Sequence, residues 1–347
     1  MKLQKLINYL ESIAPSAYQE SYDNSGLIVG DPNVTIKGVL ICLDSTEDII
    51  AEARKKKCNV IVAHHPIVFK GLKRFNGKNY VERTVMQAIK HDICIYAIHT
   101  NLDNVYRNGV NTKIAEKLSL NNLQILAPKQ NLVKFEFYLN QSQIKAYQTY
   151  YSKKGAPSGF NNVHSLLAVQ NDKKQEVAVM KYETSVAQNE VGDLVRFLQS
   201  CIGSKPLNYN TYPISGVNSQ VGSGMIGTLP KPILPATFFK RLKKAMDLEV
   251  FKHTAILGKK ISKVAVCGGS GGFLLSHAIR QGADIFITSD YKYHEFFDAD
   301  GKIIIADIGH YESEQYTIDL LHELITKKFS NFATHCTKIS TNPVFYY

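Results

Sequence analysis

The sequence predicts an α/β fold: an open, mainly parallel sheet with helices on both faces, interrupted by a smaller inserted α+β domain. Two observations indicate this class. Short apolar runs rich in β-branched residues alternate with amphipathic stretches at both ends of the chain. Strands that alternate with helices form parallel sheets through right-handed crossovers. The middle of the chain instead has segments of alternating polar and apolar residues, which are typical of half-exposed strands.

The first alternation lies between residues 37 and 118. Apolar runs predict strands at 38–44, 59–65 and 93–100, and amphipathic stretches predict helices at 46–56, 80–90 and 109–118. A further helix is predicted at the start of the chain, where apolar residues form one stripe. The stripe consists of Leu3, Leu6, Ile7, Leu10 and Ile13.

The same alternation returns after residue 260. Strands are predicted at 261–272, 283–290, 302–310 and 333–340, and helices at 273–281, 293–297 and 313–329. In the middle, segments 132–140 and 175–184 alternate, and each is followed by a helix-compatible run. We therefore expect residues 1–128 together with 225–347 to form the α/β domain, and residues 129–224 to form the inserted domain.

Composition limits the functions that the chain can have. Its 347 residues are 44% hydrophobic and 20% charged, which indicates folded domains and not disorder. The net charge of +11 favours anionic partners, but no recognition motif accompanies it, so nucleic-acid binding is not expected. Six cysteines without a Cys-x-x-Cys pair fit a reducing cytoplasm. No apolar run is long enough for a membrane span, and no signal peptide is recognisable, so we expect a cytoplasmic protein.

Histidines and carboxylates follow four of the predicted strands. They are His64 and His65 after one strand, His99 and Asp103 after the next, Asp290 and His294 after a third, and Asp307, His310 and Glu314 after a fourth. The carboxyl ends of parallel strands border the ligand crevice of an open sheet. Histidines scattered at random would not gather there, so the sequence predicts a polar site at this edge.

The spacing of these residues favours two metal ions. His64 and His65 are adjacent, and neighbouring side chains on a strand point to opposite faces, so they do not easily chelate one ion. His310 and Glu314 lie four residues apart at a helix start and can meet one metal. The set exceeds what one tetrahedral ion needs, which suggests two divalent ions joined by a carboxylate. Imidazoles with carboxylates suit zinc, iron, manganese or nickel.

Two motifs also allow simpler interpretations. The stretch "GHYESE" at 309–314 can simply open a helix, because acidic residues favour the positive end of the helix dipole. The stretch "CGGSGG" at 267–272 could cradle a phosphate, but it lacks the dinucleotide-binding spacing and is more often a tight turn. The metal interpretation depends on the joint placement of the motifs.

Several motifs together resemble one known family. They are "SYDNSGLIVGDP", "HHPIVFKGL", "YAIHTNLDNVYRNGVN", "GSGMIG", "AVCGGSGG", "ITSDYKYHEFFDA" and "DIGHYESE". In this order they resemble the Nif-three-like proteins with a dinuclear metal centre, the GTP cyclohydrolase I type 2 homologues. Tyr22 stands where the family usually has Trp, and the middle segment lacks the Gly-rich and acidic patterns of longer members.

The resemblance implies roles for individual residues. It implies that Glu314 bridges two metals and that further polar positions lie around the same cleft. The implied metal ligands are His64, His65, Asp103, His310 and Glu314, and the implied catalytic positions are His99, Asp290 and His294. The family also implies a toroidal homohexamer whose metal sites face an internal cavity.

The function expected from this resemblance is metal-dependent hydrolysis of a small molecule. For GTP, an activated water would attack C8 of the guanine ring and open the imidazole portion. His294 or His99 is the candidate acid/base, because imidazole transfers protons near neutral pH. The alternative is a non-catalytic metal-binding scaffold, a metal chaperone or a regulatory protein. A ring associated with DNA or RNA is a third, weaker interpretation that depends on the net charge alone.

Overall fold

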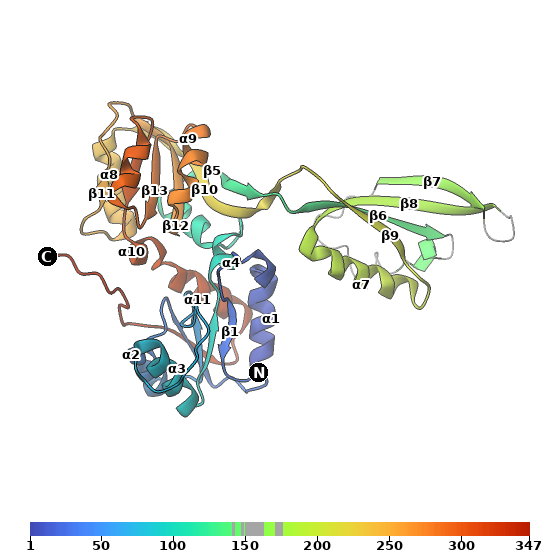
Figure 1. The fold of residues 1–347 in the computed structure, drawn as a ribbon, viewed down its shortest axis with the longest axis horizontal. Helices are drawn as coiled ribbons and strands as arrows, with labels where there is room; N and C mark the ends of the chain where they lie inside the picture. The colour runs from blue at the N-terminus through green and yellow to red at the C-terminus, as the bar shows by residue number, and fades with distance from the viewer. Residues whose placement is uncertain (141–142, 147–148, 150–162, 171–175) are drawn as a thin grey trace. The chain divides into compact units, whose positions relative to one another are not determined.

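The computed structural model describes residues 1–140, 143–146, 149, 163–170 and 176–347 (Figure 1). They form two compact units, Met1–Pro128 with Ser219–Tyr347, and Lys129–Asn218. The second division lies between Asn218 and Ser219, at the start of strand β10 (Asn218–Ile233), whereas a boundary between residues 224 and 225 was expected. The early part of β10 already belongs to the larger unit: Tyr106 N donates to the Gln220 carbonyl, and Gly222 N donates to the Asn104 carbonyl.

The larger unit contains two sheets, so the expectation of one open sheet is corrected. The five-stranded sheet has the order β1-β4-β3-β2-β15. Strands β15, β2, β3 and β4 are parallel, and β1 is antiparallel to β4. Their bounds are β1 Gly26–Val29, β2 Gly38–Cys42, β3 Val60–Ala63, β4 Cys94–Ala97 and β15 Ala333–Cys336. Thus the last predicted strand joins strands from the beginning of the chain.

The six-stranded sheet has the order β11-β14-β13-β12-β10-β5. Its central strands β12, β13 and β14 are parallel, whereas β10 is antiparallel to β12 and β11 is antiparallel to β14. The remaining bounds are β5 Asn121–Lys129, β11 Lys252–His253, β12 Ile261–Ser270, β13 Ile285–Ser289 and β14 Ile304–Asp307. The strand–helix alternation does not reveal this division, since a crossover looks the same in sequence whichever sheet it joins.

Helices cover both faces of the sheets, as expected. They are α1 Leu3–Ile13, α2 Glu47–Lys55, α3 Tyr80–Lys90, α4 Thr100–Asp103, α5 Val110–Lys117, α8 Pro235–Met246, α9 Leu275–Arg280, α10 His310–Glu314 and α11 Thr317–Lys328, with short 3-10 helices η1 Ser16–Tyr18, η3 Gly272–Leu274 and η4 Tyr293–Ala299. The helix predicted at 313–329 is therefore two helices, and the first begins at His310.

Alternation along each strand distributes apolar side chains to two faces. In β3, Val60 and Val62 enter the largest core, which also contains residues of α1, α8 and α11 and of the six-stranded sheet. Ile61 and Ala63 point the other way and pack with residues of α2 and α3. Both faces of these strands are therefore buried, which leaves the strand ends as the place for polar side chains.

The smaller unit is an α+β module. Its antiparallel sheet has the order β7-β8-β6-β9. Its elements are β6 Leu132–Asn140, β7 Val163–Gln170, β8 Glu176–Ala187, η2 Gln188–Glu190, α7 Val191–Ile202 and β9 Asn208–Pro213. Phe135 and Phe137 of the sheet share a core with Leu194 and Leu198 of α7. The helix-compatible run expected after residue 140 lies partly outside the described residues. Among the described residues, no helix is long and apolar enough to cross a membrane.

Candidate metal centre

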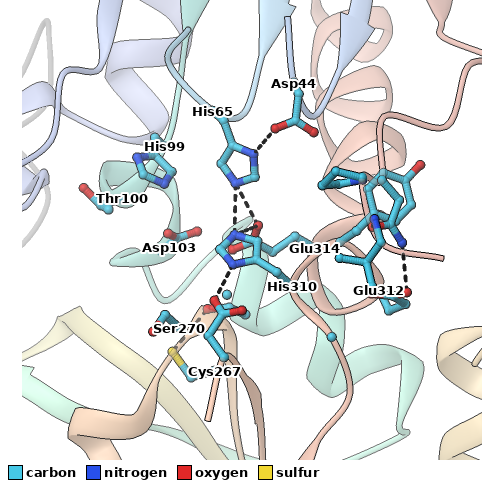
Figure 2. Close-up of a pocket in the computed structure, with 18 of the residues that line it drawn as sticks. Asp44, His65, His99, Thr100, Asp103, Cys267, Ser270, His310, Glu312 and Glu314 are labelled. Atoms are coloured by element: carbon cyan, nitrogen blue, oxygen red, sulfur yellow. Dashed lines mark hydrogen bonds and ion pairs between the residues drawn. The ribbon is translucent and has the colours of Figure 1, made fainter. Parts of the chain in front are cut away.

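Glu314 lies at the centre of the polar cluster and is only 2% exposed. Its Oε2 is 2.9 Å from His65 Nε2 and 3.1 Å from His310 Nε2, and its Oε1 is 3.7 Å from His64 Nε2. Figure 2 shows His65 and His310 converging on this carboxylate. The two oxygens of Glu314 therefore face different histidines.

These distances define two groups of potential metal ligands that share Glu314. One group is His65, His310 and Glu314, and the other is His64, Asp103 and Glu314. In each group the ligand atoms lie within 4.8 Å of one another. The five residues expected as metal ligands are thus brought together from the loop after β3 and from the short helices α4 and α10, which follow β4 and β14.

The second group contains two buried polar atoms that need a partner. His64 Nε2 and Asp103 Oδ1 lie 3.6 Å apart, and neither has a hydrogen-bond partner among the described residues. Leaving a buried polar group unsatisfied costs about 1–3 kcal/mol, and more when the group is charged. A cation between these atoms would satisfy both, so the residues present fit a metal ion.

Each ligand histidine is held through its other ring nitrogen. His64 Nδ1 donates to the Ile98 carbonyl at 2.8 Å, and His65 Nδ1 donates to Asp44 Oδ1 at 2.8 Å. His310 Nδ1 donates to Asp290 Oδ2 at 2.6 Å. Such contacts fix the orientation of metal-binding imidazoles and are typical of metal sites.

Burial, hydrogen bonds and neighbouring charges shift the pKa values of the groups in this cluster. Burial alone would lower the pKa of His65 and of His310, but hydrogen bonds to carboxylates raise them to about 10 and about 11. Burial, followed by the charge of Glu314, raises the pKa of Asp103 to about 8. Burial would also raise the pKa of Glu314, yet hydrogen bonds from His310, His64 and His65 hold it well below its usual range. Without a metal, protons on the histidines balance the carboxylates, so cations and protons compete for this site.

The glycine-rich end of β12 makes room for Glu314. Gly269 has a φ of +62°, and a Cβ on it would overlap Glu314 Oε1. Gly269 N donates to Ser313 Oγ at 2.9 Å. This hydrogen bond fixes the end of β12 against α10. Within the stretch "CGGSGG", Gly269 therefore allows the close approach of Glu314. This contact accounts for the glycine at that position without a bound phosphate.

His99 borders the cluster without joining the Glu314 groups. It precedes α4, and its Nδ1 donates to Asp23 Oδ1 at 2.7 Å. Its ring centroid lies 5.3 Å from that of His64 and 5.2 Å from that of His65. His99 also lines a cavity of about 920 Å³ that is bordered by His65, His310 and Glu314. This position suits a group that contacts a bound molecule.

The remaining predicted positions lie differently. Asp290 lines the cavity, and its hydrogen bond orients the ring of His310. His294 is exposed on η4, packs against Tyr293 and Phe297, and is absent from the described residues that line the cavity. In this chain His294 therefore does not lie on the cavity wall, and its catalytic role stays a prediction.

Sequence reasoning missed two carboxylates of the site. Asp44 directly follows the run that forms β2, as His64 follows β3, so the same strand-end rule could have found it. Asp23 follows no predicted strand and lies in a loop before β1. Its side chain accepts hydrogen bonds from His99 and from the Thr100 backbone N–H at 3.1 Å. Its distance of 76 residues from His99 along the chain left no local signal.

The fold and the cluster together define an α/β protein with a buried histidine–carboxylate centre at the ends of strands from two sheets. Comparison with known proteins specifies it further. The chain belongs to the Duf34/NIF3 (NGG1p interacting factor 3) family, whose sequence model matches residues 1–343. The resemblance found in the sequence is thereby confirmed.

Similar proteins cover the whole chain. A Halalkalibacterium halodurans protein named GTP cyclohydrolase 1 type 2 homolog is 31% identical over 365 residues, covering 98% of this chain and 97% of the relative. A Bacillus subtilis protein of the same name is 30% identical, covering 94% of this chain and 92% of the relative. The solved structure of a Bacillus cereus protein related to NIF3 matches with a TM-score of 0.83 at 27% identity, covering 100% of this chain and 99% of that chain.

Proposed function

We propose that this chain is a hydrolase that holds two divalent metal ions and acts on a nucleotide such as GTP. One observation carries the proposal: the two oxygens of Glu314 face two separate ligand groups, as a bridging carboxylate would. The ions would be held by His64, Asp103 and Glu314 on one side and by His65, His310 and Glu314 on the other. The name shared by the relatives supports GTP as the first substrate to test.

Ions bound at these ligands would supply Lewis-acid activation of water and of the electrophile. The residues of the chain contribute orientation and proton transfer. Asp44 and Asp290 hold His65 and His310 in place. Asp23 fixes one ring nitrogen of His99, and the other nitrogen is then the one to exchange a proton with a molecule in the cavity. Hydrogen bonds and the charge of His99 outweigh burial and keep the pKa of Asp23 low, so it stays ionised beside the ring.

The proposal is tested with protein purified without added metal. Elemental analysis should find two ions per chain from among zinc, iron, manganese and nickel. Incubation with GTP should then give the ring-opened formamide, from which a second water releases formate. Formate from the wild type but not from metal-stripped protein would support the proposal. If neither formate nor a ring-opened product forms from GTP but another nucleotide is hydrolysed, GTP is excluded and the hydrolase class stands.

A second candidate function is a metal-binding scaffold, chaperone or regulatory protein. The burial of one group of potential ligands favours this second function, because His64 is fully buried and Glu314 is nearly so. A group closed by protein ligands retains its ion and leaves no position for water. Two tightly held ions together with no turnover across a broad nucleotide screen would select this function.

We also propose the assembly that the family resemblance implies, a toroidal homohexamer whose centres face an internal cavity, in the cytoplasm. Light scattering coupled to size exclusion measures the assembly mass directly. A mass of six chains supports the ring, and a monomer rejects it.

A further inference from the structure

Residues 337–347 follow β15 without forming a helix or strand, and Figure 1 shows them as an extended segment. Two neighbouring side chains of this segment contact the surroundings of the metal cluster. Thr341 Oγ1 donates to Asp44 Oδ2 at 2.6 Å, and Asn342 Nδ2 donates to Glu312 Oε1 at 3.0 Å.

The Thr341 contact continues to the cluster. Asp44 uses one carboxylate oxygen for Thr341 and the other for His65 Nδ1. His65 Nε2 in turn reaches Glu314. A continuous chain of hydrogen bonds therefore leads from the extended segment to the central carboxylate. Without the hydroxyl of Thr341, the carboxylate of Asp44 could rotate and release the ring of His65.

The Asn342 contact leads to α10, on the side of the cluster that holds His310 and Glu314. Glu312 lies on α10, the helix that carries His310 and Glu314. Its carboxylate covers Gly309, where φ is +91° and a Cβ would overlap Glu312 Oε2. Asn342 thus holds the residue that covers the turn at the start of α10. Figure 2 shows this contact at Glu312, beside the cluster.

We propose that Thr341 and Asn342 are positioning residues of the metal centre and that residues 341–346 act as a strap joining its two halves. The inference depends on the proposed function only in requiring that the centre holds metal. Asp44 follows a strand of the five-stranded sheet, and Glu312 follows a strand of the six-stranded sheet. Part of the strap also lines the cavity, namely Asn342, Pro343, Val344 and Tyr346.

The residues before the strap are anchored by contacts of their own. Thr337 N donates to the Ile41 carbonyl at 2.9 Å, and Lys338 N donates to Glu52 Oε1 at 3.2 Å. Thr337 Oγ1 also hydrogen-bonds Glu52. These contacts fix the segment beside β2 and α2, away from the cluster. Thr337 therefore offers a matched control, because it too donates a hydroxyl to a carboxylate but has no path to His65.

Linkage provides a test that needs no activity. If docking of the strap favours metal binding, metal binding must favour docking by the same factor. In wild-type protein, added Zn²⁺ should slow hydrogen exchange of amides in residues 339–346. Thr341→Val keeps the shape of the side chain and removes the donor, so the slowing should shrink. Equal exchange with and without bound Zn²⁺ would overturn the strap.

Metal affinity gives the second measurement. Zn²⁺ titrations against a chelator should show Thr341→Val weakening one of the two ions by about tenfold, the lower end of the effect of outer ligand partners. The Zn²⁺ affinities of Thr341→Ser and Thr337→Val should stay within about twofold of wild type, which is small beside the tenfold effect expected of an outer ligand partner. Unchanged affinity for both ions in Thr341→Val would overturn the positioning role.

Crystal structures separate this inference from the proposed function. If wild-type protein binds no metal, the metal centre is rejected. The positioning role is then still tested in the metal-free wild type and Thr341→Val variant. The Asp44 carboxylate should rotate away from His65 in the variant, and an unchanged Asp44–His65 pair would overturn the role of Thr341.

Discussion

Gly269 and Glu314 pack so closely that the backbone of one occupies the space beside the carboxylate of the other. Two requirements coincide at Gly269. Its φ of +62° favours glycine, and its missing side chain leaves room for Glu314 Oε1. The end of β12 therefore fixes where the central carboxylate of the cluster can lie.

Replacing Gly269 by alanine should abolish binding of at least one metal ion and lower the melting temperature. Gly282 is the matched control, because its φ is +71° and a Cβ there meets no atom within 4 Å. Gly282→Ala should cost about 1–2 kcal/mol, the cost of a left-handed backbone with a side chain, and should retain both ions. Thermal unfolding and elemental analysis measure both effects. Equal behaviour of the two variants would contradict the packing argument.

Glu314→Gln should lose metal more completely than Asp103→Asn. Glu314 belongs to both ligand groups, whereas Asp103 belongs to one, so the first change affects both ions and the second affects one. Metal content per chain, measured after dialysis, distinguishes the variants. Glu323→Gln, on the exposed side of α11, serves as the control. Two ions per chain in the Glu314 variant would exclude a bridging role.

His99→Gln should leave both ions bound and lower turnover roughly 10²–10⁴-fold, the usual contribution of a general acid or base. The reason is its place on the cavity wall and its hydrogen bond to Asp23. Metal analysis and a turnover assay on the substrate found by screening give the two readouts. If His294→Ala removes turnover and His99→Gln does not, His294 reaches a site through contacts that a single chain does not contain.

Asp284 should make stability depend on pH. Its Oδ2 accepts hydrogen bonds from the backbone of Ser262 and Lys263, and Lys259 Nζ lies 2.9 Å from Oδ1. Burial would raise the pKa of Asp284, but the hydrogen bond from Lys263 and the contact with Lys259 lower it below its usual value. Because the pKa is depressed in the folded state, the stabilisation is present above the unfolded pKa of about 3.9. It is lost as the pH falls through the folded value.

The measurement for Asp284 is urea unfolding between pH 7 and pH 2. At neutral pH, Asp284→Asn should lower the free energy of unfolding by about 1–3 kcal/mol, the scale of a hydrogen bond to a charged group. The difference between wild type and variant should shrink as the pH falls below 4, since the wild-type carboxylate becomes protonated. A difference that stays constant with pH would contradict this assignment.

The smaller unit should be removable. Strands β5 and β10, which lead into and out of it, are neighbours in the six-stranded sheet. A Cβ on Gly222 would lie 2.6 Å from Pro128 Cα, so the ends to be rejoined are close. Replacing residues 129–218 by a short Gly/Ser linker should give a folded protein that keeps both ions, with little loop entropy to overcome. Circular dichroism and metal analysis test this, and an insoluble or metal-free product would contradict it.

Local patterns in the sequence were sufficient to predict which polar residues cluster, but they did not predict the division into two sheets. His64, His65, His310 and Glu314 were found because strand ends and helix spacing are short-range patterns. The division into two sheets depends on pairings such as Gly38 with Ala333, which leave no local pattern. His294 was expected near the cleft because it follows the same predicted strand as Asp290, yet it is exposed on η4 and does not line the cavity.

The position of β15 has a consequence for biosynthesis. Residues 333–336 pair with β2, so β2 lacks this neighbour until nearly 300 residues after it have been synthesised. His64 and His65 are made early, and Glu314 is made late. Contacts so far apart in sequence form slowly. The nascent chain therefore presents His64, His65 and Asp103 before Glu314 exists, and the polar cluster cannot be complete until residue 314 has been made.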